Sequence, residues 1–249
     1  VAMLLGRSVL LAGASTLVAV ILGVPIAVLG VKTDLPLRRT LLATLSAPLI
    51  FPSYVLAQGW FRVLGKNGLV AHIFDQNMGR AASSLLFSFE GGVLVLATAV
   101  LPVVILFTAA ALSSVELALE DAGRLVASWP RVLWRITLPL ARPGILMAAV
   151  LSFLLAIGDY GVPSFLRLEV FPVESFTQIS AFYDAGAATA AWMPMLAVVL
   201  ACTAGMSRWL PRGGRFQWKV GATPVLALGK WRNVACAVVA LLALGIVVV

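Results

Sequence analysis

The sequence predicts an all-α fold, a polytopic transmembrane helix bundle with about six membrane helices. Three observations lead to this fold class. Of the 249 residues, 61% are hydrophobic and only 11% are charged, whereas a soluble domain is about 45–50% apolar and about 25% charged. Long apolar runs recur along the whole chain. Basic residues are concentrated on alternate loops, as in proteins that cross a membrane repeatedly.

Each apolar run is close to the ~20 residues that a helix needs to cross the hydrocarbon core. The runs are Ser8–Val31, Thr40–Leu64, Ser84–Leu112, Pro143–Tyr160, Ala188–Trp209 and Asn233–Val249. Prolines inside them, such as Pro25 and Pro102, are tolerated because neighbouring membrane helices satisfy the freed carbonyls. We therefore expect one membrane helix from each run.

The placement of lysine and arginine predicts the orientation. These residues are concentrated in Val31–Arg39, Ser113–Arg142 and Pro211–Arg232, and the alternate loops Gly65–Ser83 and Gly161–Ala187 hold fewer. The more basic loops are expected in the cytoplasm. Topology then accounts for the net charge of +8, so nucleic acid is not an expected partner, whereas membrane lipid is.

Few side chains suit catalysis or metal binding. Cys202 and Cys236 lie inside apolar runs without metal-ligand spacing, and the single histidine, His72, lies in a loop. We predict no catalytic residue, no metal site and no cofactor held by this chain. Asp159 is the one acid inside a predicted membrane segment. It is a candidate for the translocation pathway, and the alternative is that it caps the turn at Gly161.

The cytoplasmic loop Glu116–Pro143 is the most informative segment. A helix is expected from Ser114 to Ala127, with Ser113 or Ser114 as N-cap and Glu116 in the first turn. Pro130 disfavours a helical Trp129, which predicts a break there. A second short helix is expected over Pro130–Ile136, after which Leu138-Pro139 turns the chain back to the membrane. Such a helix pair is either a docking surface for a motor protein or an amphipathic loop on the lipid headgroups.

This loop resembles the EAA loop of binding-protein-dependent ABC transporter permeases. The family pattern is E-A-A, three residues, Gly, nine residues, I-x-L-P. Glu120-Asp121-Ala122 stands at its start, and Ile136, Leu138 and Pro139 fall in register. Asp121 replaces an alanine of the pattern, and Val126 replaces the glycine that permits a turn between the short helices. The resemblance implies a MetI-like, type I importer fold.

Other segments resemble ferric-iron-type permeases, namely Leu22–Leu29 with the turn Lys32–Arg39, Ala47–Val55, and Ile157–Pro163, which is similar to their D-F-G-x-P stretch. In that subfamily two homologous halves are fused. The resemblance implies that residues 1–210 are a first permease half lacking its first helix. Residues 211–232 would be a cytoplasmic linker, and residues 233–249 would begin the first helix of a second half.

The family imports a solute that a periplasmic binding protein delivers, and an ATPase dimer that docks on the EAA loops binds the ATP. The chain holds no Walker A motif, since Gly59 to Asn67 has the wrong spacing, so it is not itself expected to be an enzyme. The resemblance implies a multi-pass protein of the bacterial inner membrane that pairs with a second permease half. It assigns ATPase docking to Glu120, Asp121, Ala122, Val126, Ala127, Ser128, Ile136, Leu138 and Pro139.

The expected cargo is ferric iron, with thiamine, polyamine, sulfate and phosphonate as alternatives. We expect Glu120 to pair with a basic group of the ATPase, and a Glu120→Lys variant to uncouple ATP hydrolysis from uptake. A secondary transporter, which needs no ATPase, is the main rival function. A membrane-embedded enzyme is a further rival, and it would need clustered polar side chains at membrane depth.

Overall fold

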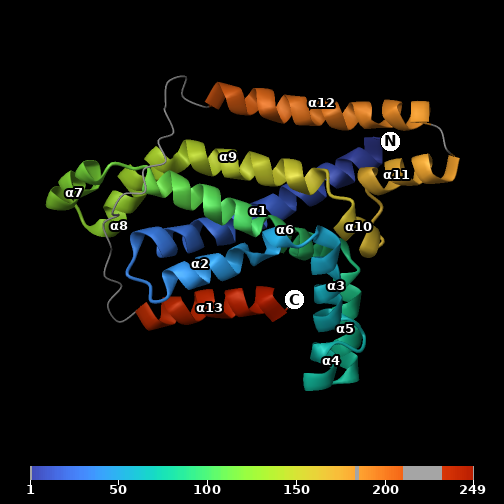
Figure 1. Cartoon of the computed structure of the whole chain (residues 1–249), viewed down its shortest axis with the longest axis horizontal. Helices are drawn as coiled ribbons and strands as arrows, with labels where there is room; N and C mark the ends of the chain where they lie inside the picture. Colours follow the sequence, from blue (N-terminus) through green and yellow to red (C-terminus); the bar gives the residue numbers. More distant parts are fainter. Residues whose placement is uncertain (1, 183–184, 210–231, 249) are drawn as a thin grey trace.

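Three long helices form the centre of the molecule in the computed structural model, which describes residues 2–182, 185–209 and 232–248. They are α1 (Ala2–Lys32), α6 (Phe89–Ser113) and α9 (Leu138–Ile157), and each contacts the other two. Figure 1 shows them running along a common direction. Within the described residues, Met3–Lys32, Phe89–Ser113 and Trp129–Ile157 are long and apolar enough to cross a membrane. The predicted helical membrane bundle is confirmed.

Small residues let α1 approach α6 closely. Ala12, Ala19 and Ala27 of α1 are buried, and a Cβ on Gly23 would lie only 2.8 Å from Cγ1 of Val104. Close backbone approach through small side chains is the usual way in which membrane helices gain packing energy. Both helices continue through their internal prolines, Pro25 and Pro102.

The prediction of one continuous helix over Thr40–Leu64 is wrong, because the chain bends within this segment. The segment forms α2 (Arg38–Ser46), the 3₁₀ turn η1 (Ala47–Ile50) and α3 (Ser53–Leu64), with a bend of 109° between its two parts. Phe51 is extended, with φ −98° and ψ 141°, as expected for a residue before a proline. Pro52 therefore ends the first part and redirects the chain.

The remaining helices surround this centre. At one end, α3 is followed by α4 (Leu69–Ile73) and α5 (Gln76–Leu86), which are drawn across the direction of the long helices in Figure 1. Then α10 (Gly161–Phe165) and α11 (Phe171–Phe182) follow α9 at that same end. Along the sides, α12 (Ala185–Trp209) contacts α9 and α13 (Arg232–Val248) contacts α2.

The predicted last two spans are helical, and their apolar stretches, Trp192–Met206 and Arg232–Ile246, are shorter than the central spans. The predicted linker 211–232 lies outside the described residues except for Arg232. The domain boundaries proposed for residues 1–210 and 233–249 stay predictions.

Candidate functional site

A pair of short helices lies at the end of the bundle where α1 and α6 finish (Figure 1). The first, α7 (Leu117–Val126), is the helix predicted from Ser114 to Ala127 with a shorter N-terminal end. Ser113 and Ser114 do not cap it, because their hydroxyls donate back to the α6 carbonyls of Ala109 and Ala111. The N-cap residue is Glu116, whose side chain makes no capping hydrogen bond.

The second helix runs into the membrane without the predicted turn at Leu138-Pro139. Here α8 (Trp129–Val132), the π turn η2 (Leu133–Thr137) and α9 follow one another, so that Trp129–Ile157 is one continuous span. The amide of Leu138 donates to the carbonyl of Leu133. Because Pro139 has no amide, it is accommodated at the start of α9, directly after this widened turn. Trp129, where the break was predicted, is the first residue of α8, and the break lies at Ala127 and Ser128.

Glu120 of α7 is fully buried and forms an ion pair with Lys32, the last residue of α1. The Lys32 Nζ atom lies 2.8 Å from Oε1 and 2.9 Å from Oε2 of Glu120. The hydroxyl of Thr137 in η2 donates to Oε1 at 2.8 Å. All three side chains are excluded from solvent. The carboxylate therefore joins the end of α1, the middle of α7 and the start of the α9 span.

This arrangement differs from the expectation that Glu120 meets a basic group of another protein. Each buried charge costs several kcal/mol of desolvation, which a good pair with additional hydrogen bonds offsets. Here the carboxylate has two donors, and Lys32 also lies at a helix C-terminus, where the dipole favours a cation. Glu120 is thus an internal anchor of the helix pair.

Gly123 sets how closely α7 approaches the α8–η2 segment. A Cβ at this position would lie 2.7 Å from Cδ1 of Ile136 and 3.3 Å from Cγ2 of Val132. A side chain at position 123 would therefore require the end of the Ile136 side chain to shift. On the same side, the guanidinium of Arg124 lies 5.6 Å from the ring centre of the buried Trp129. These contacts hold α7 in one orientation against the membrane span.

The backbone of the bend between α7 and α8 explains why a valine is tolerated at position 126, where the family pattern has glycine. Ala127 has φ −144° and ψ 154°, and Ser128 has φ −66° and ψ 150°, so both are extended. In the described chain, the non-glycine residues with positive φ are Leu37 and Arg167, neither of which is in this bend. The turn is therefore compatible with a side chain at position 126.

Three large apolar side chains of the helix pair are highly exposed. The exposed fraction is 87% for Leu125, 85% for Val126 and 72% for Trp134. Of the other predicted docking residues, Asp121, Ala122, Ser128 and Pro139 are exposed, and Ala127, Ile136 and Leu138 are half-buried. Exposed apolar side chains of this size are candidates for contact with a partner. We call Leu125, Val126 and Trp134 the apolar tip.

Sequence reasoning missed Lys32, Thr137 and Gly123 as parts of this site. Thr137 stands inside the I-T-L-P segment, so its position in the motif was a usable signal. Lys32 is separated from Glu120 by 88 positions, and its only signal was a lone cation directly after an apolar run. The close packing at Gly123 depends on the position of the neighbouring helix, which the sequence does not show.

Asp159 lies at the opposite end of the bundle and acts as a cap. Its Oδ1 accepts a hydrogen bond of 2.9 Å from the backbone amide of Val162, in the first turn of α10. This is the capping alternative considered for the residue, and a role in the translocation pathway stays a prediction. Further along the chain, Glu169 forms an exposed 2.8 Å ion pair with Arg7.

The family comparison fits this geometry. Residues 15–212 match the family described as "Binding-protein-dependent transport system inner membrane component". The chain belongs to this family. The match includes the helix pair, its anchor, the C-terminal part of α1 and all of α6 and α9. This settles the general class, a membrane subunit of ABC importers.

The names of individual relatives specify what those proteins transport. The permease is 30% identical over 201 residues, 78% of this chain and 86% of the relative, to the molybdenum transport system permease protein ModB of Escherichia coli. It is 34% identical over 196 residues to a probable molybdenum ABC transporter permease of Haloferax volcanii, covering 78% and 68% of the two chains. It is 28% identical over 148 residues to a probable sulfate transport system permease of Chlorokybus atmophyticus, covering 59% and 50%.

The fold also matches a solved transporter. In an inward-facing structure of the MetNI methionine ABC transporter, a chain superimposes with a TM-score of 0.66 at 18% identity, covering 83% of the permease and 94% of that chain. This likeness confirms the MetI-like fold expected from the sequence. At this identity it carries no information on the transported solute.

Proposed function

We propose that the permease is the membrane-spanning subunit of an ABC importer for a tetrahedral oxyanion, molybdate or sulfate. The proposal is supported by relatives named for molybdenum and for sulfate transport. Both anions are tetrahedral and doubly charged, so a route for one suits the shape and charge of the other. None of the relatives reported above is named for iron, and the oxyanion replaces ferric iron as the proposed cargo.

The observation that carries the transport mechanism is the rigidly anchored apolar tip. Leu125 and Val126 are almost fully exposed on α7, while Glu120 on the same helix is locked to Lys32. A force applied to the tip would pass through the ion pair to α1, and through Gly123 to the α9 span. We infer that a separate ATPase dimer docks on this tip and supplies all ATP binding and hydrolysis.

The remaining partners follow the family. A periplasmic binding protein would deliver the anion to the end of the bundle that holds α3–α5 and α10. A second permease half, in the same chain or in a homologous subunit, would complete the route between the two halves. The complex would lie in the bacterial inner membrane.

The test is uptake into cells that lack their own molybdate and sulfate importers. The complete permease is expressed with its cognate ATPase and binding protein, and the uptake of radiolabelled molybdate, sulfate and ferric citrate is compared. We expect saturable uptake of one or both oxyanions and background uptake of iron. An ATPase variant that binds ATP without hydrolysing it is the matched control, and it should reduce uptake to background.

Two outcomes would contradict the proposal in different ways. Saturable iron uptake without oxyanion uptake would overturn the cargo and restore the expectation from the ferric-iron-type segments. Oxyanion uptake that persists with the inactive ATPase would overturn the ATP-driven mechanism and favour a secondary transporter.

A further inference from the structure

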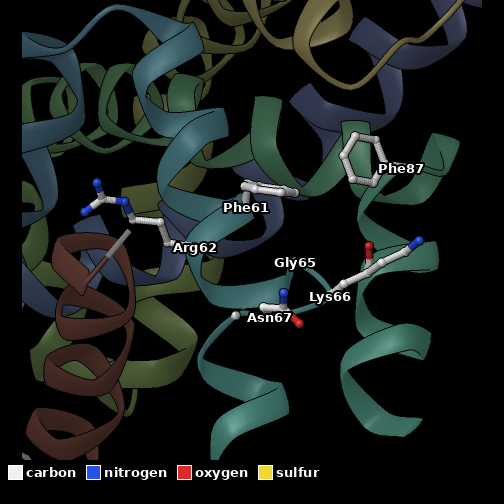
Figure 2. A pocket seen from close by; sticks show the side chains of 8 residues that line it. Phe61, Arg62, Gly65, Lys66, Asn67 and Phe87 are labelled. Atoms are coloured by element: carbon white, nitrogen blue, oxygen red, sulfur yellow. The ribbon is translucent and has the colours of Figure 1, made fainter. Parts of the chain in front are cut away.

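A hollow opens at the end of the bundle opposite the apolar tip, between α3, α5 and the turn after α10. It consists of two adjoining cavities of about 410 Å³ and about 600 Å³, which share Phe61, Lys66, Ser83 and Phe87 as lining residues. The larger cavity also touches Arg167. We call these five residues the outer pocket. Figure 2 shows Lys66 and Phe87 on one side of Phe61, with Arg62 pointing to the other side.

The outer pocket is positively charged. Lys66 and Arg167 are exposed, and no carboxylate belongs to the lining of either cavity. Within the described part of the chain, neither side chain has an ion-pair or hydrogen-bond partner. Two cations that line one cavity without a carboxylate favour an anionic ligand there.

Ser83 supplies a donor at the bottom of the pocket. The residue is only 5% exposed, yet it lines both cavities. Among the described residues its hydroxyl has no hydrogen-bond partner, although its backbone carbonyl accepts from Phe87. Because Ser83 lines both cavities, its hydroxyl is available to donate to water or to a ligand there.

Arg167 is held in the pocket at a conformational cost. Its φ is 58°, in the left-handed region. The amide of Leu168 donates to the carbonyl of Pro163, and the amide of Arg167 donates to that of Ser164, which is the Schellman pattern at the end of α10. Glycine is favoured at this position because other residues pay roughly 1 kcal/mol or more there. Arg167 thus occupies a position where glycine would have less backbone strain. This indicates that the charge of its side chain has a role.

Aromatic side chains form one wall of this open hollow. The Phe61 ring meets those of Phe87 and Phe165 edge to face, at centroid distances of 6.0 Å and 6.1 Å. The cavity volumes exceed what one tetrahedral anion needs, so room remains for water or for a larger group that carries the anion.

We propose that the outer pocket binds a tetrahedral oxyanion group through Lys66, Arg167 and the Ser83 hydroxyl. The group is either a free dianion, such as sulfate, molybdate or phosphate, or the phosphate of an anionic lipid headgroup at this membrane surface. The site does not depend on the transported solute, because inorganic phosphate presents the same chemistry as sulfate.

The test uses the complete transporter in phosphatidylcholine nanodiscs, with binding of radiolabelled sulfate, molybdate and phosphate measured by equilibrium dialysis in the absence of the binding protein. The variants are Lys66→Gln and Arg167→Gly, and the second removes the charge while relieving the left-handed strain. The control is Arg80→Gln, which removes an exposed cation of α5 outside both cavity linings. Melting curves confirm that each variant is folded.

For a free anion, we expect saturable binding that weakens about tenfold or more in Lys66→Gln and Arg167→Gly, as for one lost charge-assisted hydrogen bond. Arg80→Gln should bind as the parent does. For a lipid phosphate, free anions fail to bind, and native mass spectrometry from mixed nanodiscs shows phosphatidylglycerol retained over phosphatidylcholine. That retention should be lost in the same two variants and kept in Arg80→Gln.

The proposal is overturned if neither ligand is retained, or if Arg80→Gln weakens retention as much as the pocket variants do. Failure here leaves the proposed transport function intact, because uptake is measured separately with the binding protein present. Conversely, phosphate binding at this pocket would stand even if the transported solute proved to be iron.

Discussion

The ammonium of Lys32 lies 2.8 Å from a carboxylate oxygen of Glu120, and both side chains are fully buried. The pair connects the C-terminal end of α1 to the short helix that carries the apolar tip. A residue that the motif suggests as a surface contact is thus part of the interior. The predictions below separate this anchoring role from docking.

Removing one partner of the ion pair should be more damaging than removing both. Glu120→Leu leaves the Lys32 ammonium buried without a counter-charge, which costs about 3–5 kcal/mol for pairs of this kind. The double variant Lys32→Met/Glu120→Leu should recover most of that free energy of unfolding, because no uncompensated charge remains. The measurement is a double-mutant cycle by denaturant unfolding in detergent. Additive losses in the double variant would show that the pair is not coupled.

Glu120→Lys should act mainly through stability. It places two ammonium groups in one buried site, so we expect a poorly folded permease with a much reduced yield, together with loss of transport. Size-exclusion profiles and melting temperatures check this. A well-folded Glu120→Lys protein that still stimulates its ATPase would instead support the uncoupling expected from the sequence.

The hydroxyl of Thr137 should contribute a smaller amount. Thr137→Val removes the donor to Glu120 Oε1 while it keeps the shape, and a lost hydrogen bond to a charged group costs about 1.5–3 kcal/mol. Thr137→Ser, which keeps the hydroxyl, is the matched control and should lose less. Equal losses in both variants would indicate that packing of the methyl group, and not the hydrogen bond, is responsible.

The contact at Gly123 predicts a compensating pair of substitutions. In Gly123→Ala the new Cβ would lie 2.7 Å from Cδ1 of Ile136, and overpacking of this kind costs about 1–3 kcal/mol. Ile136→Val removes that Cδ1 atom, so the double variant Gly123→Ala/Ile136→Val should regain stability and uptake relative to Gly123→Ala. If Ile136→Val gives no rescue, α7 does not rest on Ile136 as described.

The apolar tip should matter for partner binding and not for folding. Leu125 is 87% exposed, so Leu125→Asp should change the free energy of unfolding by no more than about 0.5 kcal/mol. It should nevertheless abolish co-purification of the ATPase and stop uptake. Met78→Asp is the matched control, because it places the same charge on an exposed apolar residue of α5 at the opposite end of the bundle, and it should keep ATPase co-purification. Retained ATPase binding in Leu125→Asp would exclude the tip as the docking surface.

Much of the fold could be predicted from the sequence because composition and hydrophobic run length are local properties. The long helices α1, α6 and α9 follow from their apolar runs, and the α7–α8 pair follows from the loop pattern. The break at Phe51-Pro52 was missed because prolines occur inside both intact and broken membrane helices. Pro25 leaves its helix intact, and tertiary contacts decide between the two outcomes.

The sequence located the segment that forms the site, but it did not predict how the residues of the site are arranged in space. The register of Glu120 with Ile136 and Pro139 located the loop. Whether Glu120 faces a partner or the interior depends on where the end of α1 lies, and that relationship spans 88 positions of sequence. The sequence also did not predict that η2 continues directly into α9. Proline usually indicates a turn, but here the π turn before Pro139 accommodates it within a continuous helix.

Docking of an ATPase on the apolar tip is tested most directly by site-specific photo-cross-linking in the complete transporter. A photoreactive amino acid is placed at Val126, and matched probes are placed at Arg80, at the opposite end of the bundle, and at Leu10 of α1, which is 66% exposed. We predict a cross-link to the ATPase from position 126 alone. Absence of that cross-link while uptake remains active would contradict docking of the ATPase on the apolar tip. An equally strong cross-link from position 80 would contradict it as well.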